Sequence, residues 1–384
     1  MADNKENKVL NVPALRFPEF ADEWHKQSLG EIGETIIGLT YKPSDVVESN
    51  GTIVLRSSNI KNGVIDYSDL VRVNKPIKER IITKENDILI CARNGSQRLI
   101  GKNAIIKKED ANNTFGAFMM VYRSKDNPFI LPLLSTKRYF SQVGENLGAR
   151  INQITTSDFN GFDFYFPNSH AERAKIAELF RLIDERIATQ NKIIEDLKKL
   201  KSAIYQEMFG SLVAQTLKLG QVAEVVKGKQ VNGTELLEQG DYYVMNGGTL
   251  PSGWLNKYNT EANTISISEG GNSCGYVQYN TSPYWSGGHC YSLKILHPQE
   301  TSDLYLYHFL KWQEENIMAL RIGSGLPNIQ KKDLLHFPVI LPTITQQNKI
   351  VLILSAIEEK VSCEISITQY FVKQKEYLLS QLFI

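Results

Sequence analysis

Cysteine is scarce in this sequence, and its placement argues against disulfide bonds and against a metal site. The 384 residues include four cysteines, Cys91, Cys274, Cys290 and Cys363, and no two of them form a C-x-x-C pair. Disulfide scaffolds and zinc sites need denser or regularly spaced cysteines. Cys274 with His289 and Cys290 could begin a metal site, but a fourth ligand at the usual spacing is missing. We therefore expect free thiols and a reducing, cytoplasmic compartment.

Long apolar runs and an excess of one charge are also missing. No stretch of about 18 apolar residues occurs, and residues 1–8 are polar and charged. The sequence therefore predicts neither a membrane span nor a signal peptide. The 43 Lys and Arg residues balance 42 Asp and Glu residues, for a net charge of +1. The whole-chain charge thus gives no indication of nucleic-acid binding.

Catalytic motifs are incomplete wherever they begin. Segment 95–103 resembles a phosphate-binding loop, but it is one residue too long, and neither Ser nor Thr follows Lys102. The histidines, among them His170 and His336, show no metal-ligand spacing. Two tripeptides resemble the active-site motif of adenine methyltransferases without its second proline: Asn127-Pro128-Phe129 and Ser282-Pro283-Tyr284. The sequence therefore contains no complete motif for ATP binding, for a metal site or for a self-sufficient methyltransferase, and we expect this chain to hold no metal or cofactor of its own.

What the sequence does contain is one pattern written twice. At an offset of 175, Ile154, Asp158 and Pro167 match Ile329, Asp333 and Pro342. At an offset of 174, a second group matches: Ile176, Ile183, Met208 and Phe209 with Ile350, Ile357, Leu382 and Phe383. A repeat of nearly half the chain indicates two copies of one module. Each copy consists of a globular unit followed by a long helix, and the two copies should be related by a pseudo-two-fold axis.

The two helices carry an apolar stripe along their whole length. Neither Pro nor Gly occurs from residue 171 to 209, and apolar residues recur at alternating spacings of three and four, as in a coiled coil. About 39 residues give each helix a length of roughly 58 Å. We predict an antiparallel pair, and the alternative is that each helix packs only on its own globular unit. The predicted seam is Ile176, Ile183, Ile187, Ile194, Leu197, Ile204, Ile350, Ile357, Val361, Phe371 and Leu378.

The predicted fold class is α+β, with two β-rich α/β domains joined by the helix pair. The expected boundaries are an N-terminal segment 1–27, a first domain 28–167, a first helix 168–210, a second domain 211–342 and a second helix 343–384. Short β-rich runs predict the strands: 52–55, 64–67, 87–92, 103–106 and 117–122 in the first domain, and 242–245, 264–267, 275–279 and 290–295 in the second. Three landmarks correspond between the domains: Leu29-Gly30 with Leu219-Gly220, 87–90 with 264–267, and 114–117 with 286–289.

Charge separates the two domains. Residues 30–150 contain 18 Lys and Arg against 13 Asp and Glu, a net charge of +5. Residues 219–326 contain 6 against 10, a net charge of −4. The first domain could hold a phosphate backbone through bulk charge. The second would need a few basic residues placed locally, such as Lys257, together with backbone amides.

Several phrases together resemble a known family. They are Leu15-Arg16-Phe17-Pro18-Glu19-Phe20 before Trp24, Leu55-Arg56-Ser57-Ser58-Asn59-Ile60 followed by Gly63-Val64-Ile65-Asp66, Ile90-Cys91-Ala92-Arg93-Asn94-Gly95-Ser96, Ile151-Asn152-Gln153-Ile154, and Ser268-Glu269-Gly270-Gly271-Asn272-Ser273. With the duplicated layout, the chain resembles the specificity subunit of type I restriction-modification systems over essentially its whole length. Each phrase alone is weak, whereas the repeat with both helices is specific.

The resemblance implies a DNA-binding subunit without catalytic activity of its own. Each globular unit would be a target recognition domain for one half of a split double-stranded DNA site, and the helix pair would fix the gap between the halves. Two methyltransferase subunits with S-adenosylmethionine would bind the chain, and restriction subunits with ATP and Mg could join them. The competing interpretation is a coiled-coil scaffold that binds two partner copies and no DNA.

Base recognition needs Arg, Lys, Asn, Gln or Ser on exposed loops. For segment 93–98 the alternative is a solvated hairpin tip, and for the Gly-flanked asparagines it is an ordinary turn. Asn152, Gln153 and Asn328, in matched segments, are expected to share a structural or phosphate-binding role. The predicted DNA contacts are Lys42, Arg56, Ser58, Asn59, Arg93, Asn94, Ser96, Arg98 and Arg150 in the first domain, and Lys227, Lys229, Asn246, Asn272, Ser273, Arg321 and Ser324 in the second.

Overall fold

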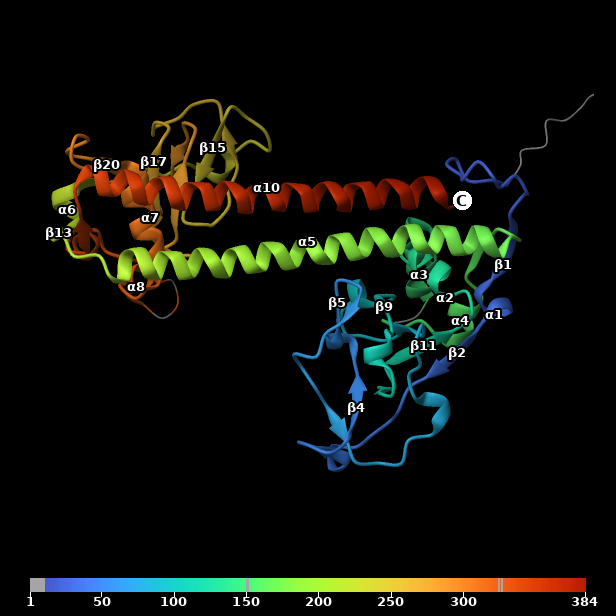
Figure 1. Cartoon of the computed structure of the whole chain (residues 1–384). Helices are drawn as coiled ribbons and strands as arrows, with labels where there is room; N and C mark the ends of the chain where they lie inside the picture. The colour runs from blue at the N-terminus through green and yellow to red at the C-terminus, as the bar shows by residue number, and fades with distance from the viewer. Residues whose placement is uncertain (1–10, 150–151, 324, 326) are drawn as a thin grey trace, which may run out of the picture. The chain divides into compact units, whose positions relative to one another are not determined.

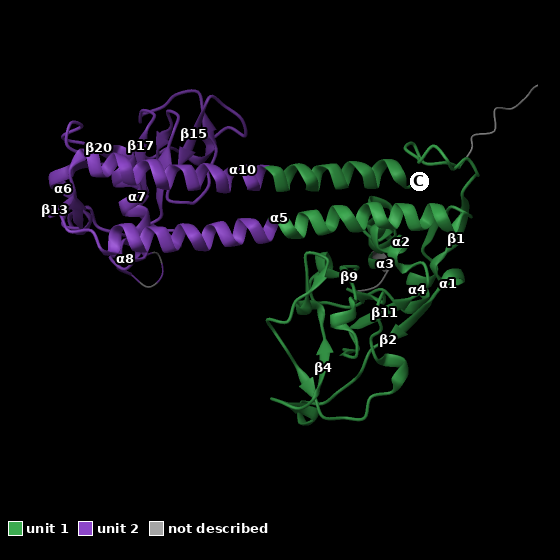
Figure 2. Ribbon diagram, in the orientation of Figure 1, with its two compact units in different colours: residues 1–190, 367–384 green, residues 191–366 purple. Residues whose placement is uncertain are grey.

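The chain folds into two compact units. The computed structural model describes residues 11–149, 152–323, 325 and 327–384. Unit 1 takes the described residues up to Gln190 together with Ile367–Ile384, and unit 2 is Asn191–Ser366 (Figure 2). The division cuts through both long helices, so each unit holds a globular part and one end of each helix. No helix among the described residues combines the length and apolar character needed to cross a bilayer.

Small sheets form the globular part of unit 1 (Figure 1). A four-stranded antiparallel sheet has the order β2 (Glu34–Ile37), β11 (Met119–Arg123), β8 (Ile88–Cys91) and β9 (Asn103–Ile105). A second sheet has the order β10 (Thr114–Phe115), β4 (Thr52–Leu55), β7 (Arg72–Val73) and β3 (Val46–Val47). The remaining pairs are β1 (His25–Ser28) with β12 (Asp163–Phe166) and β5 (Ile60–Lys61) with β6 (Val64–Ile65). The short helices are α1 (Leu29–Ile32), α2 (Asn127–Leu133), α3 (Lys137–Ala149) and α4 (Thr156–Asn160).

Unit 2 repeats this plan. Its four-stranded antiparallel sheet has the order β14 (Ala223–Lys227), β20 (Cys290–Ile295), β17 (Thr264–Ser268) and β18 (Val277–Asn280). Its second sheet is β16 (Trp254–Leu255), β15 (Tyr242–Met245) and β19 (Trp285–Ser286), and β13 (Gln215–Lys218) pairs with β21 (Pro338–Leu341). The short helices are α6 (Leu219–Val222), α7 (Asp303–Trp312), α8 (Glu314–Met318) and α9 (Lys331–Leu335). The predicted α+β class with two domains is confirmed.

The same backbone contacts recur at equivalent places in the two units. Leu29 N–H donates to Phe162 O at 2.9 Å, and Leu219 N–H donates to Phe337 O at 2.8 Å. In the second sheets, β10 runs parallel to β4 as β19 runs parallel to β15. The predicted match of 114–117 with 286–289 was wrong by one position. The strand registers align Gly116 with Gly287, because each N–H bonds the last residue of its neighbouring strand.

Gly38 directly follows β2, and Gly228 directly follows β14; each allows the chain to turn at the end of that strand. A Cβ on Gly38 would lie 2.3 Å from the carbonyl oxygens of Phe115 and Gly116. A Cβ on Gly228 would lie 2.2 Å from Gly287 O. Only a residue without a side chain lets the backbones approach this closely. The shared glycine thus fixes how the two sheets meet in each unit.

The long helices are α5 (His170–Gly210) and α10 (Ile344–Leu382). Within unit 1 they run antiparallel, since Phe180 stacks on Phe383 at 5.8 Å while Asp184, further along α5, binds Lys375, earlier on α10. Within unit 2, Lys201 of α5 pairs with Glu358 of α10 at 2.5 Å. All the residues of the predicted seam are buried or half-buried.

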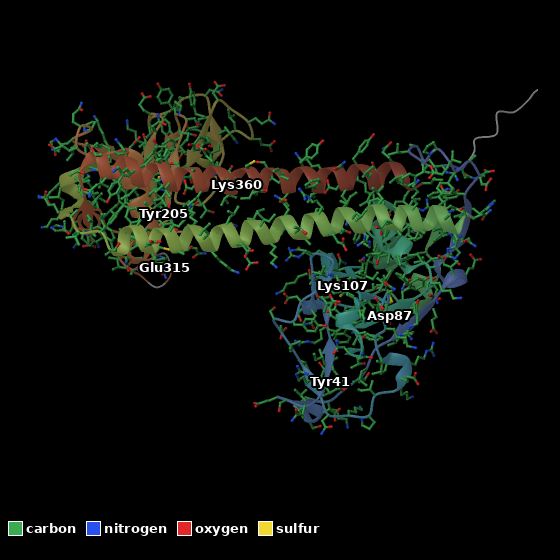
Figure 3. All side chains as sticks on the ribbon, in the orientation of Figure 1. Tyr41, Asp87, Lys107, Tyr205, Glu315 and Lys360 are labelled. Carbon is green, nitrogen blue, oxygen red and sulfur yellow. The ribbon has the colours of Figure 1, made fainter. Side chains whose placement is uncertain are left out.

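The helix ends also enter the cores of the globular parts. Ile176, Phe180 and Phe383 belong to the core of unit 1 with Trp24 and Phe129. Tyr205, labelled in Figure 3, joins the core of unit 2 with α7 residues and with Ile350 and Leu354. Pairing between the helices and packing on the globular units are therefore both present, whereas the sequence analysis treated them as alternatives.

Candidate nucleic-acid interface

Three segments of unit 1 meet at one edge, and we call this place the loop junction of unit 1. They are the turn of 3-10 helix at Ser57–Asn59, the loop 93–98 after β8, and residues 152–153. The side-chain amide of Asn94 donates to Ser57 Oγ at 3.0 Å, and that of Asn152 donates to Gly95 O at 3.1 Å. The sequence placed all three segments among its candidates but gave no reason for them to touch. The structure brings them together.

Arg93 is the central exposed residue of this junction. Its backbone forms an antiparallel bridge with Gln153, and its N–H donates to Phe118 O at 3.0 Å. Its guanidinium lies over the Phe118 ring, 5.1 Å from the ring centroid. The contact holds a long, flexible side chain over an aromatic face that is itself 59% exposed.

A shallow pocket opens beside this pair. Its volume is about 300 Å³, and its lining includes Ile37, Arg93, Phe118, Gln153 and Thr156. Ile37 is 58% exposed, so two apolar side chains face solvent next to a cation and polar groups. Phe118 and Ile37 were not among the predicted contacts, because both lie within or beside strands and their side chains carry no polar atom.

The other predicted contacts of unit 1 divide by exposure. Arg98 and Ser58 are exposed, and Ser96 is half-buried. Arg56 is half-buried and pairs with Asp69 at 2.8 Å. Lys42 is exposed on a different loop, next to the turn at Pro43–Asp45. Arg150 lies outside the described residues.

The prediction that Asn59 contacts DNA has to be corrected. It is 0% exposed, and its side chain accepts a hydrogen bond from Arg56 N–H at 2.9 Å. Its amide nitrogen donates to Asp66 O and Asp69 O at 2.9 and 2.7 Å. The side chain of Asn59 is therefore engaged in hydrogen bonds within the loop. Asn59 shapes this loop and has no exposed group that could contact DNA.

Unit 2 builds the same junction from different side chains. Ile329 N–H donates to Glu269 O as Ile154 N–H donates to Ala92 O, at 2.8 and 2.9 Å. Gly270 bridges Asn328 as Arg93 bridges Gln153. The expected shared structural role of 152–153 and Asn328 is therefore visible as backbone pairing. A phosphate-binding role stays a prediction.

Charge in unit 2 is largely neutralised at this place. Lys227 Nζ lies 2.6 Å from Glu269 Oε1, and Glu269 is only 9% exposed. The Tyr291 hydroxyl donates to the same oxygen at 3.0 Å, and burial followed by that bond raises the pKa of Tyr291. Lys227 is thus engaged with Glu269 in the free protein.

The remaining predicted contacts of unit 2 are mostly accessible. Lys229, Asn272 and Arg321 are exposed, and Ser273 is half-buried. Asn246 is half-buried, and its Oδ1 accepts the N–H of His289 at 3.1 Å, so part of its role is to hold the turn. Ser324 lies outside the described residues.

Three of the four cysteines are buried, and the fourth, Cys363, is exposed. Cys91, Cys274 and Cys290 are buried free thiols, and burial raises the pKa of Cys91 and of Cys290 to about 11. Protonated thiols are poor nucleophiles and poor metal ligands. Over the residues that the structure describes, no group of three or more His, Cys, Asp and Glu is placed to hold a metal ion.

Comparison with known proteins places both repeats in one family. Residues 21–199 and 214–369 match the family described as Type I restriction modification DNA specificity domain. A putative type I specificity subunit of Mycoplasma pneumoniae is 37% identical over 144 residues, which cover 37% of this chain and 38% of that protein. The match thus spans well under half of that relative's length. A putative type I restriction enzyme specificity subunit of Methanocaldococcus jannaschii is 24% identical over 98% of this chain and 96% of its own length.

The fold is shared with a solved structure. The crystal structure of a type I restriction-modification system S subunit from M. genitalium matches with a TM-score of 0.67 and 19% identity, over 97% of this chain and 99% of that one. Together with the two family matches, which cover most of the sequence, this agrees with the internal repeat. The chain belongs to the type I restriction-modification DNA specificity family, with one copy of the family's domain in each half.

Proposed function

We propose that this chain is the DNA-specificity subunit of a type I restriction-modification complex, and that each unit recognises one half of a split DNA sequence. The proposal rests on one observation. The same backbone pairing, which we call the backbone frame, occurs in both units, but the exposed side chains on it differ. Arg93 in one frame stands where Gly270 stands in the other. A repeated frame with unlike surfaces suits two half-sites of unlike sequence, because bases are distinguished by the side chains that face the groove.

The two units should contribute unequally to affinity. Residues 30–150 carry a net charge of +5, whereas residues 219–326 carry −4. Since contacts to phosphates supply most of the sequence-independent affinity, unit 1 should supply most of it here. In unit 2 Lys227 is paired with Glu269, and the exposed cations that could contact phosphates include Lys229, Lys257, Lys294 and Arg321.

The chemistry of the complex would come from partners. Two methyltransferase subunits would carry S-adenosylmethionine and methylate adenine, and restriction subunits would bring ATP and Mg. Both long helices leave large apolar side chains in solvent, and such surfaces commonly mark protein interfaces. The most exposed are Leu182, Leu200, Leu352, Tyr370 and Tyr377. We assign them to partner binding, with this chain non-catalytic and the complex acting on DNA in the cytoplasm.

Methylation mapping tests the function directly. The full chain is expressed with its methyltransferase subunit in a host without adenine methylation, and the genome is sequenced by a method sensitive to modified bases. We expect one split motif with methylated adenine in each half. A soluble, co-purifying complex that leaves the genome unmethylated, and whose DNA binding shows no sequence preference, would contradict the proposal.

A further inference from the structure

Phe118 and His289 occupy the same position in the two units. Phe118 O accepts the N–H groups of Ala92 and Arg93 at 3.0 Å each, and His289 O accepts the N–H of Glu269 at 2.9 Å. Each residue directly precedes a central strand of the first sheet, β11 or β20. The registers agree, because Met119 lies opposite Cys91 and Cys290 lies opposite Ser268.

The backbone at this position is fixed in both units, but the side chains differ completely. Both side chains are exposed, Phe118 to 59%. In unit 1 the ring carries the Arg93 guanidinium. In unit 2 the residue equivalent to Arg93 is Gly270, and a Cβ there would lie 3.6 Å from His289 Nδ1, so the imidazole lies beside bare backbone.

The arrangement in unit 1 has the chemistry of a base-recognition subsite. An arginine guanidinium matches O6 and N7 of guanine with two parallel hydrogen bonds, and an apolar ring matches the methyl group of thymine. Stacking on Phe118 restricts the guanidinium before DNA arrives, which lowers the entropy lost on binding. The exposed Ile37 extends the apolar surface across the pocket.

We propose that Arg93 and Phe118 form the main base-recognition subsite of unit 1, with guanine on Arg93 and the methyl group of an adjacent thymine on Phe118, and that His289 holds the equivalent place in unit 2. The inference rests on the proposed function and adds to it the positions that carry sequence preference. It also gives a role to the two exposed apolar side chains, Ile37 and Phe118.

Methylation mapping of two single variants gives the first test. Phe118→Ala should change the methylated motif in one half only, and His289→Ala should change it in the other half only. Phe140→Ala is the matched control, because Phe140 is an exposed phenylalanine of unit 1, 47% exposed, on α3. The proposal fails if neither variant changes the motif, or if both change the same half.

Modified DNA gives the second and sharper test. In binding assays with the full chain and its methyltransferase partner, thymine is replaced by uracil in the half that Phe118→Ala changes, which removes only the methyl group. The unmodified protein should lose affinity about fourfold, as expected for one buried methyl, and Phe118→Ala should lose none on the same replacement. Replacing the neighbouring guanine by 7-deazaguanine should weaken the unmodified protein by about tenfold and Arg93→Ala hardly at all.

The outcomes distinguish a failure of the proposed function from a failure of the subsite. If the unmodified complex has no preferred DNA sequence, the proposed function itself is wrong. If it has a split motif but Phe118→Ala retains the full uracil effect, or the half contains no guanine next to thymine, only the subsite is wrong. Thermal unfolding of each variant confirms that an altered motif reflects recognition and not loss of folded protein.

Discussion

Glu172, in the first turn of α5, accepts two hydrogen bonds from the guanidinium of Arg16, at 2.7 and 2.8 Å. Trp24 Nε1 donates a third to the same carboxylate at 3.2 Å. The Glu172 side chain is 1% exposed, so this ion pair is formed away from water. A carboxylate at the start of a helix also gains from the helix dipole. The pair therefore ties the N-terminal segment of unit 1 to the long helix.

Breaking this pair should destabilise unit 1 strongly. Arg16→Met removes the cation and leaves a buried carboxylate without its partner, which should cost about 3 kcal/mol in the free energy of unfolding. The matched control is Arg181→Met, whose ion pairs with Glu178 and Glu185 are exposed and should contribute little to stability. Urea unfolding measures both. Similar losses for the two variants would show that the buried pair is not special.

Alanine substitutions at Gly38 and Gly144 should change the stability of unit 1 in opposite directions. Gly38→Ala forces a methyl group against two carbonyl oxygens and should destabilise unit 1 by at least about 2 kcal/mol. Gly144 lies within α3 with no atom within 4 Å of an added Cβ, so Gly144→Ala should stabilise by up to about 1 kcal/mol. Thermal unfolding distinguishes them, and a neutral Gly38→Ala would mean that the two sheets can separate there at no cost.

His308 should make unit 2 sensitive to acid. Burial lowers the pKa of His308 to about 4, against the opposing attraction of Glu358. Its ring Nδ1 lies 2.8 Å from the Tyr205 hydroxyl. In the unfolded chain this histidine has an ordinary pKa of about 6.5. Between about pH 6.5 and pH 4 it therefore binds a proton when the chain is unfolded but stays neutral when the chain is folded. Stability should therefore fall as the pH drops from about 6.5 towards 4, by about 2 kcal/mol between pH 7 and pH 5 from this one group.

The variant His308→Asn tests that linkage. Asparagine retains a polar group near the Tyr205 hydroxyl but cannot titrate. Urea unfolding at pH 7 and pH 5 should show a smaller loss for the variant than for the unmodified chain. An unchanged difference between the two pH values would assign the acid sensitivity to other groups.

Arg93→Ala combined with Arg98→Ala should weaken or relax recognition of one half-site and leave the other unchanged. Both residues are exposed on the loop junction of unit 1. Arg80→Ala, which removes an arginine that is 67% exposed outside this junction, is the control. Binding is measured on a panel of half-site variants at two salt concentrations. An equal loss on every sequence, with a shallower dependence on salt, would instead identify the pair as phosphate contacts.

Periodicity in the sequence predicted the two long helices and part of the strands. The strands predicted at 52–55, 242–245 and 290–295 coincide with β4, β15 and β20. The long helices were predicted from an uninterrupted apolar stripe. In the first of them, no Pro or Gly from residue 171 to 209 could end the helix earlier. Many shorter elements were not predicted, among them β2 and β14, each of which leads directly into a glycine. The predicted domain boundaries and DNA contacts stay predictions.

The site depended on pairings that no local pattern encodes. Asn59 is of a residue type that often contacts DNA, but its side chain accepts one hydrogen bond and donates two within segment 56–69, and these close the loop around it. Phe118 had the composition of a core residue, but the turn after Gly116 leaves it in solvent. Only the register of β11 against β8 places it beside Arg93. The register of a sheet is set by all of its strands, so the sequence alone does not show that Phe118 lies beside Arg93.

The two units share backbone-to-backbone contacts at their loop junctions, between Ile154 and Ala92 in one and between Ile329 and Glu269 in the other. Such bonds do not depend on the side chains beside them. Mutation at the exposed positions can therefore alter the preferred DNA sequence without destabilising the fold. A lineage carrying this chain could acquire a new specificity through few substitutions, and one half could diversify while the other remained under selection.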